Sequence, residues 1–159
     1  MSRAAQLVDL ARQSGVMIAT AESCTGGLVA GAITDIAGSS AVFDRGFVTY
    51  TNAAKVEMLG VLPETLATHG AVSEAVAREM AAGALARSGA QVAVSVTGIA
   101  GPGGSDHKPE GRVCFALTTA HGTNAVTHEF GAIGRAHVRR ASVEQALQML
   151  IDAVSGLPG

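Results

Sequence analysis

Hydrophobic residues along the chain switch repeatedly between helix-like and strand-like spacing. Leu7, Val8, Leu10 and Ala11 recur as on one face of an amphipathic helix, predicted over residues 3–14. The next apolar run, residues 16–21, is short and unbroken, which is typical of a buried strand. The same patterns, with Gly, Pro, Ser and Thr at the junctions, predict the other elements. Helices are expected over residues 28–36, 51–59, 63–69, 74–87 and 135–154, and strands over residues 42–50, 91–96, 113–118 and 125–130.

The order of these elements predicts the fold class. Strands separated by helices form parallel pairs, whereas the last two strands form a hairpin that turns near residues 121–124 and adds antiparallel pairing. We therefore expect a three-layer α/β/α domain with a mixed sheet. No repeat, linker or low-complexity tract divides the chain, so residues 1–159 are interpreted as a single domain.

Composition and charge exclude some classes of binding partner for this protein. The formal net charge of −2 gives no general attraction to nucleic acids or anionic membranes, and the scarcity of aromatic residues (3%) argues against a base-stacking surface. No apolar stretch is long enough for a membrane span, and the charged N-terminus does not resemble a signal peptide. Two cysteines outside any CxxC pair indicate reduced thiols. We expect a cytoplasmic protein that binds neither nucleic acid nor membrane.

The histidines provide no metal-binding motif. None of the five follows an HxH or HExxH spacing. No metal site is therefore predicted, and no cofactor is expected.

The segment from Thr20 to Gly27 carries the strongest chemical signal. A buried strand stops abruptly at Glu22, Ser23, Cys24 and Thr25, and two glycines then lead into a helix. Free N–H groups and the positive end of the helix dipole meet at such a corner, which suits an anion or a developing oxyanion. A simple helix cap remains the alternative interpretation of these hydroxyl groups.

Ser23 and Cys24 are the candidate nucleophiles, and position along the chain does not choose between them. Tyr50 and Lys55 follow the second predicted strand. If the two strands are neighbours, these residues and Ser23 lie at the edge where open α/β sheets bind ligands. A buried lysine loses its proton readily and can act as a base, although an exposed helix lysine fits the pattern too.

Two further segments are candidates for ligand contacts. The Gly-rich loop that begins at Thr97 and Gly98 follows a strand, and its N–H groups could approach an anion, although it matches neither a P-loop nor a dinucleotide fingerprint. Arg135 and Arg139 share one face of the last helix, where paired arginines can hold a phosphate or carboxylate. A surface connection and a solvated basic face are the respective alternatives.

Taken together, these motifs resemble the CinA C-terminal domain family, the family of the PncC-type nicotinamide-nucleotide amidases. The resemblance extends over nearly the whole chain in the family's order, and the chain is similar to the stand-alone form, without the additional N-terminal domain of longer CinA proteins. The segments that carry it are residues 20–27, 46–55, 70–73, 95–102 and 111–113.

The resemblance implies an activity and a set of roles. The family hydrolyses the carboxamide of nicotinamide mononucleotide to nicotinate mononucleotide and ammonia, a step of pyridine-nucleotide salvage. It implies Ser23 as nucleophile, Lys55 as base and Tyr50 as an assisting residue. It also implies that Thr97 and the glycines after it line the nucleotide pocket and that Arg139, with Arg135, holds the phosphate. The substrate-binding residues expected on this basis are Glu22, Cys24, Thr25, Gly26, Thr97, Gly98, Arg135 and Arg139.

Two other functions remain open. One is a nucleotide-binding or regulatory module of the competence/damage-inducible type, which binds a ligand without turnover. The other is a hydrolase that uses Cys24 as its nucleophile. In each case the expected partner is a small nucleotide, and the apolar helix faces suggest a homo-oligomer.

Overall fold

The computed structural model describes residues 1–105 and 107–157, and it contains a mixed five-stranded sheet with the strand order β2-β1-β3-β4-β5. β1 (Ile18–Glu22) pairs in parallel with both β2 (Phe43–Val48) and β3 (Val92–Gly98). β4 (Arg112–Thr119) and β5 (Gly122–Glu129) complete the sheet in antiparallel fashion. The predicted mixture of parallel and antiparallel pairing is confirmed.

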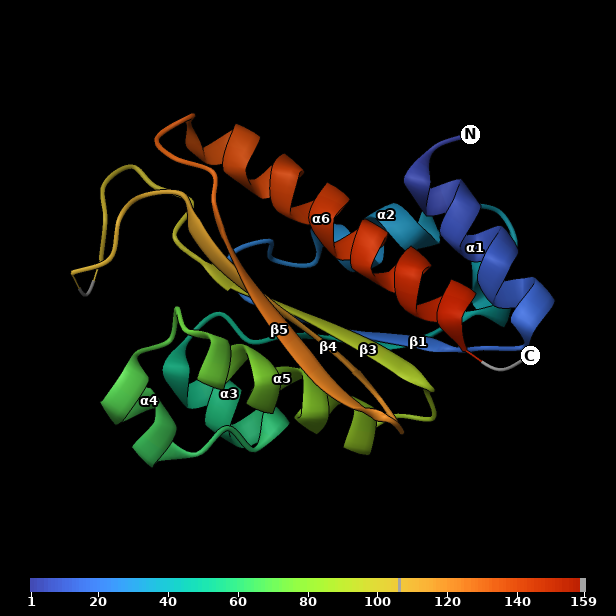
Figure 1. Cartoon of the computed structure of the whole chain (residues 1–159), viewed down its shortest axis with the longest axis horizontal. Helices are drawn as coiled ribbons and strands as arrows, with labels where there is room; N and C mark the ends of the chain where they lie inside the picture. The colour runs from blue at the N-terminus through green and yellow to red at the C-terminus, as the bar shows by residue number, and fades with distance from the viewer. Residues whose placement is uncertain (106, 158–159) are drawn as a thin grey trace.

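Helices cover both faces of this sheet (Figure 1). α1 (Arg3–Ser14), α2 (Leu28–Thr34) and α6 (Arg135–Gly156) lie on one face, and α3 (Asn52–Leu59), α4 (Pro63–His69) and α5 (Glu74–Ala86) lie on the other. The three-layer α/β/α architecture expected from the sequence is therefore confirmed.

Burial along the strands follows their position in the sheet. Every residue of β1, which lies between β2 and β3, is buried, because helices cover both of its faces, and its sequence is accordingly a continuous run without alternation. β5 lies at the edge, where exposed and half-buried residues largely alternate. Side chains that sit deep in the molecule, such as Glu22 at the end of β1, thus need partners within the protein.

Local signals in the sequence account for the helix boundaries. Ser2, Thr51 and Ser73 cap α1, α3 and α5, each accepting a hydrogen bond from a backbone N–H of the first turn. Gly15 and Gly60 end α1 and α3 in the left-handed conformation that glycine adopts without strain. Most of the predicted boundaries agree with the structure to within two residues.

Three details differ from the prediction. A 3₁₀ turn at Ser39–Ala41 precedes β2, and β5 begins at Gly122, three residues before the predicted start of this strand, because Thr119 already pairs with Gly122. The second strand ends at Val48, so Thr49 and Tyr50 leave the sheet and turn toward α3. This last difference matters for the site, where both residues contribute their carbonyl groups.

Within the described ranges, 1–105 and 107–157, the helices are all too short or too polar to cross a membrane.

Candidate active site

The carboxyl ends of the three parallel strands bring the predicted chemical groups together at one edge of the sheet. Ser23 follows β1, Thr49 follows β2, and Thr97 and Gly98 end β3. Because Glu22 is in register with Val48 on one side and Val96 on the other, β1 and β2 end at the same level, and β3 continues two residues further to Gly98. This edge is where open α/β sheets bind their ligands, as the sequence predicts.

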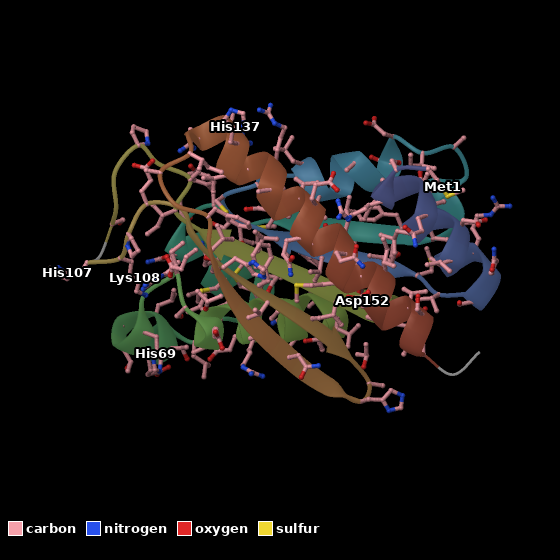
Figure 2. The ribbon with its side chains drawn as sticks, turned by 45° about the horizontal axis from the view of Figure 1, so that its top comes forward. Met1, His69, His107, Lys108, His137 and Asp152 are labelled. Carbon is pink, nitrogen blue, oxygen red and sulfur yellow. The ribbon has the colours of Figure 1, made fainter. Side chains whose placement is uncertain are left out.

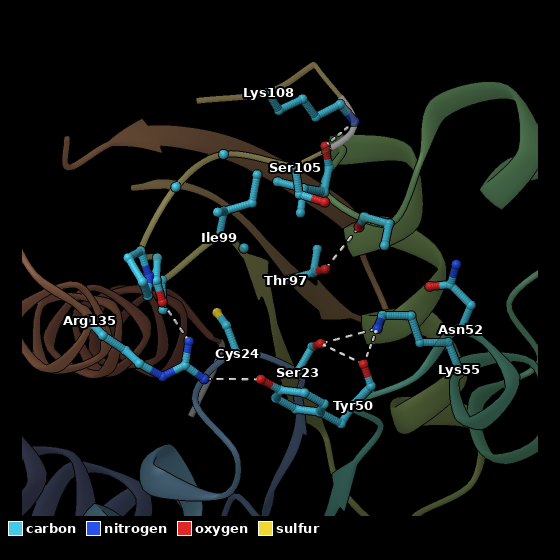
Figure 3. Close-up of a pocket in the computed structure, with 18 residues that line it drawn as sticks. Ser23, Cys24, Tyr50, Asn52, Lys55, Thr97, Ile99, Ser105, Lys108 and Arg135 are labelled. Carbon is cyan, nitrogen blue, oxygen red and sulfur yellow. Dashed lines mark hydrogen bonds between the residues drawn. The ribbon is translucent and has the colours of Figure 1, made fainter. Parts of the chain in front are cut away.

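Ser23 and Lys55 are in direct contact there (Figure 3). The Ser23 Oγ lies 3.1 Å from the Lys55 Nζ. Lys55 also donates to the carbonyl oxygens of Thr49 at 3.1 Å and of Tyr50 at 3.3 Å. Side chains on a helix lean toward its N-terminus, so a lysine one turn into α3 reaches back to the carbonyls that precede the helix.

Burial changes the protonation of Lys55. Only 1% of the residue is exposed, and among the described residues it forms no ion pair with a carboxylate. Desolvation therefore lowers the pKa of its ammonium group, and the nearby Cys24 opposes this shift when it is ionised. A neutral amine has two N–H bonds and one lone pair. Since the two carbonyls accept the two N–H bonds, the lone pair is left for the Ser23 hydroxyl.

Cys24 lines the same pocket but is poorly suited to ionise. Its burial raises the pKa of the thiol to about 11, and the Glu22 carboxylate acts in the same direction. Lys55 and Arg139 lower this pKa too little to compensate. Its neighbour Ser23 has the direct hydrogen bond to Lys55. The geometry therefore favours Ser23 over Cys24 as the nucleophile.

Tyr50 contributes to the site through two different groups. Its carbonyl oxygen accepts from Lys55 and lies 3.5 Å from the Ser23 Oγ. Its hydroxyl oxygen accepts a hydrogen bond of 3.0 Å from Arg135, and the residue is 58% exposed. The backbone of Tyr50 thus orients the Ser23–Lys55 pair, while its ring forms part of the open rim.

A cavity of about 320 Å³ opens in front of Ser23 and Lys55. Thr97 and Gly98 line it, as predicted, together with the loop that follows them. Thr97 is buried and donates to the carbonyl of Ala71, which fixes the segment before α5 against the cavity. Gly98 is needed for packing, because a Cβ atom there would come within 2.6 Å of the Val113 side chain.

Arg135 spans the rim of this cavity. It donates to the carbonyl of Gly101 at 2.7 Å on one side and to the Tyr50 hydroxyl on the other (Figure 3). Its guanidinium is exposed and faces no carboxylate among the described residues, so it is placed to meet an anionic group of a ligand.

Four of the predicted substrate-binding residues lie behind the cavity wall instead of on it: Glu22, Thr25, Gly26 and Arg139. The buried Glu22 carboxylate accepts from the N–H groups of Val29 and Ala30 and from the Thr25 hydroxyl. It therefore caps α2 and occupies N–H groups that an anion was expected to use. Arg139 donates to the carbonyl oxygens of Cys24 and Thr25.

Lys108 is a cavity residue that the sequence analysis did not single out. It comes from the long loop between β3 and β4, and its ammonium group donates to the carbonyls of His69 and Val72. Figure 2 shows Lys108 beside His69 at the end of the molecule that carries this loop. A lone lysine in a Gly-rich loop is the one signal that could have indicated it. Within the part of the chain that the structure describes, no group of His, Cys, Asp and Glu is arranged to hold a metal ion.

The fold and the site together define a class: α/β proteins in which a buried lysine contacts a serine at the ligand-binding edge of a mixed sheet. Within this class, the chain belongs to the CinA C-terminal domain family, whose model matches residues 1–154. The resemblance seen in the sequence is thus confirmed.

Individual relatives extend over most of the chain. It is 54% identical to a protein of Escherichia coli K12 named nicotinamide-nucleotide amidohydrolase PncC, over 94% of this chain and 92% of that one. A solved structure from Agrobacterium tumefaciens, described as a competence/damage inducible protein, is 54% identical with a TM-score of 0.87 and covers 98% of this chain and 97% of its own. A CinA superfamily structure from Klebsiella pneumoniae reaches a TM-score of 0.93 at 35% identity, with the same coverage.

Other relatives are longer proteins. A CinA-like protein of Mycolicibacterium gilvum is 52% identical over 90% of this chain, which corresponds to only 34% of that protein. The domain thus occurs both nearly alone and within longer chains.

Proposed function

We propose that the protein is an amidohydrolase that converts nicotinamide mononucleotide to nicotinate mononucleotide and ammonia. The observation that carries this proposal is the 3.1 Å contact between the Ser23 Oγ and the buried Lys55 Nζ. The relatives named nicotinamide-nucleotide amidohydrolase supply the substrate, and the cavity with Arg135 at its rim suits a phosphorylated nucleotide.

The first half of the reaction forms an acyl-enzyme. Neutral Lys55 accepts the Ser23 proton while the Ser23 oxygen attacks the carboxamide carbon. The carbonyl oxygen becomes an oxyanion, which backbone N–H groups near Ser23 stabilise. When the C–N bond breaks, Lys55 returns the proton to the departing nitrogen, either directly or through the Tyr50 hydroxyl, and ammonia leaves.

The second half releases the product. A water molecule attacks the ester between Ser23 and the nicotinoyl group, and Lys55 takes its proton. The tetrahedral intermediate collapses, the proton returns to Ser23, and nicotinate mononucleotide leaves. Throughout both halves Arg135 holds the phosphate, and Thr97, Gly98 and the loop after them enclose the ribose and the ring.

The first prediction concerns the nucleophile. Purified protein should release ammonia from nicotinamide mononucleotide without added metal, and Ser23→Ala should lower kcat by at least about 10³-fold, because the acyl-enzyme cannot form. Ammonia release is measured with a coupled glutamate dehydrogenase assay. The fold of the variant should persist, since the Ser23 hydroxyl contacts only the Lys55 amine and, at 3.5 Å, the Tyr50 carbonyl, and Lys55 keeps its two carbonyl acceptors without it.

Cys24→Ala is the matched control, because it changes the next residue in the same cavity. It should retain turnover within a few fold of the wild type. If Cys24→Ala were inactive and Ser23→Ala active, the thiol would be the nucleophile. If the folded wild type bound the nucleotide without releasing ammonia, the regulatory-module alternative would replace the amidase.

A further inference from the structure

The Lys108 side chain joins two segments that both line the cavity. One is the Gly-rich loop, residues 99–105, which Lys108 follows in the sequence. The other is the connection between α4 and α5, which contributes Ala71 and Val72. The Lys108 ammonium group donates to the carbonyl oxygen of His69 at 2.6 Å and to that of Val72. One side chain thus links residues that lie 39 and 36 positions apart along the chain.

The position of this ammonium group suits a positive charge. His69 is the last residue of α4, and the carbonyl groups at a helix C-terminus lack partners within the helix and carry a partial negative charge. Lys108 forms no ion pair with a carboxylate among the described residues, so two carbonyl dipoles are its anchors. Hydrogen bonds from a charged donor are stronger than those between neutral groups. Lys108 therefore caps α4 from outside and holds the loop against this helix end.

The backbone on both sides of this contact leaves room for it. Ser105 and Lys108 exchange two backbone hydrogen bonds, of 3.1 and 2.8 Å, which fix Lys108 relative to the loop. A Cβ atom at Gly104 would come within 2.3 Å of the Lys108 carbonyl oxygen, and one at Gly70 would lie 3.1 Å from the Lys108 Nζ. Glycine at both positions therefore permits the close approach of the loop and the α4–α5 connection.

The outer part of the loop has no other hydrogen-bonded anchor among the described residues. Backbone hydrogen bonds of Ile99 fix the base of the loop beside β4, and Arg135 holds the Gly101 carbonyl. Residues 102–105 are exposed, and within the described part of the chain their hydrogen bonds stay inside the connection between β3 and β4. The contacts of Lys108 are therefore what fastens this outer part to another element.

We infer that Lys108 is a positioning residue: it holds residues 102–105 against the end of α4 and so keeps this part of the cavity wall in place around the bound nucleotide. Figure 3 shows Lys108 at the opposite end of the cavity from Arg135 and away from Ser23. Lys108 therefore acts on substrate binding, and neither on bond breaking nor on the phosphate contact. The inference rests on the proposed amidase function.

The test uses two variants that break the contact in different ways. Lys108→Met removes the donors and the charge but keeps most of the side-chain length. Gly104→Ala keeps the charge, but its Cβ atom displaces the Lys108 backbone. Arg78→Met is the matched control, because Arg78 also donates to a distant carbonyl, that of Thr123, but does not line the cavity.

Each variant is measured with nicotinamide mononucleotide and with nicotinamide riboside, which has the same carboxamide but no phosphate. Where turnover of the riboside is too slow, it is measured as a competitive inhibitor. Both loop variants should raise KM, or the inhibition constant, by about 5–20-fold for both compounds, with kcat changed less than about threefold, because uniform binding is lost while Ser23 and Lys55 stay in contact. Arg78→Met should behave as the wild type.

A KM increase confined to the mononucleotide in Lys108→Met, with Gly104→Ala unchanged, would overturn the inference and make Lys108 an anion ligand. Unchanged kinetics in Lys108→Met, or a loss of kcat at constant KM, would overturn it as well. If one of the two loop variants does not fold, as judged by circular dichroism, the other decides. Failure of both to fold would overturn the inference, because the contact would then be needed for the fold itself.

Amide hydrogen exchange without any ligand separates this inference from the proposed function. Peptides that cover residues 99–105 and 69–73 should exchange faster in Lys108→Met than in the wild type, whereas peptides from α1 should not change. Faster exchange in these two segments supports the inference even if the wild type releases no ammonia. Equal exchange in a folded Lys108→Met would contradict it.

Discussion

At the scale of single residues, the site depends on the number of acceptors around one amine. Lys55 Nζ has three neighbours, two of which are carbonyl oxygens that can only accept. This arrangement is satisfied by an ammonium group that donates three times and by a neutral amine that donates twice and accepts once. Burial favours the neutral amine, which can accept a proton. Because both forms fit the same three neighbours, the Lys55 side chain could take up the Ser23 proton without moving.

The protonation of Lys55 predicts a pH profile. The base must be neutral to accept the proton, so kcat/KM should be low at acidic pH and rise as pH increases through the pKa of Lys55. Since burial lowers this pKa, the midpoint should lie below the ordinary value of 10.5. Values of kcat/KM, obtained from initial rates at low substrate concentration across a pH series, report the ionisation of the free enzyme and test this midpoint.

Lys55→Arg is the matched variant for the pH profile. Its guanidinium stays charged at every accessible pH, so activity should remain at least about 10²-fold below the wild type without a rising limb. A wild-type profile that stays flat from acid to alkaline pH would exclude Lys55 as the base.

At the scale of elements, two helical glycines allow a controlled test of packing. Gly83, in α5, lies so close to α3 that a Cβ atom would come within 2.0 Å of the Leu59 carbonyl oxygen. Gly31, in α2, has no neighbouring atom within 4 Å of the same position. The two glycines differ in their surroundings but share the same conformational cost in a helix.

We therefore expect opposite effects from the same substitution. Gly83→Ala should lower the free energy of unfolding by at least about 2 kcal/mol, because α3 must move away from α5. Gly31→Ala should raise it by about 0.5–1 kcal/mol through helix propensity alone. Urea denaturation followed by circular dichroism measures both, and stabilisation by Gly83→Ala would show that the contact between α3 and α5 is looser than described.

The elements themselves were predictable because their signals are local. Ser73 before α5 and Gly60 after α3 mark helix ends within a few residues, and the strand β3 is visible as an apolar run. The contacts of Arg139 with Cys24 and Thr25 join positions more than 100 residues apart and depend on how α6 crosses the sheet. A periodic pattern carries no information of this kind, which is why the sequence could indicate a basic face but not its partner.

The candidate site shows the same limit. Ser23 and Lys55 could be brought together from sequence, since each follows a parallel strand and such ends share one edge. Lys108 could not, because its loop has no regular geometry from which a direction follows. The sequence also did not predict that Glu22 binds the N–H groups at the start of α2. An acidic residue before a helix is equally compatible with a helix cap and with a ligand-binding site.

At the scale of the whole molecule, the charge of the cavity differs from that of the protein. The chain carries a formal net charge of −2, but the described residues around the cavity include the cationic side chains of Lys108 and Arg135 and no Asp or Glu. Such a local field attracts anions even when the overall charge does not. The expected homo-oligomer remains a prediction, which light scattering in solution would test.

This local field predicts a dependence on ionic strength. Raising salt toward about 0.5 M shortens the screening length to a few ångström, so KM for nicotinamide mononucleotide should increase several-fold. The kcat value should change little, because Ser23 and Lys55 are buried and in contact. Uncharged nicotinamide serves as the control inhibitor, and a KM insensitive to salt would argue against an electrostatic contribution from Arg135 and Lys108.

The residues proposed to react with the substrate and those that surround it come from different halves of the sequence. Ser23 and Lys55 both lie within the first 55 residues, Ser23 directly after β1 and Lys55 on α3, whereas Lys108, Arg135 and the Gly-rich loop come from the second half. The Gly-rich loop and Arg135 can therefore be redesigned without changing Ser23 and Lys55, the pair proposed to break the carboxamide C–N bond. A library confined to residues 99–105 and 135 would explore new nucleotide amides while leaving the reactive half of the molecule untouched.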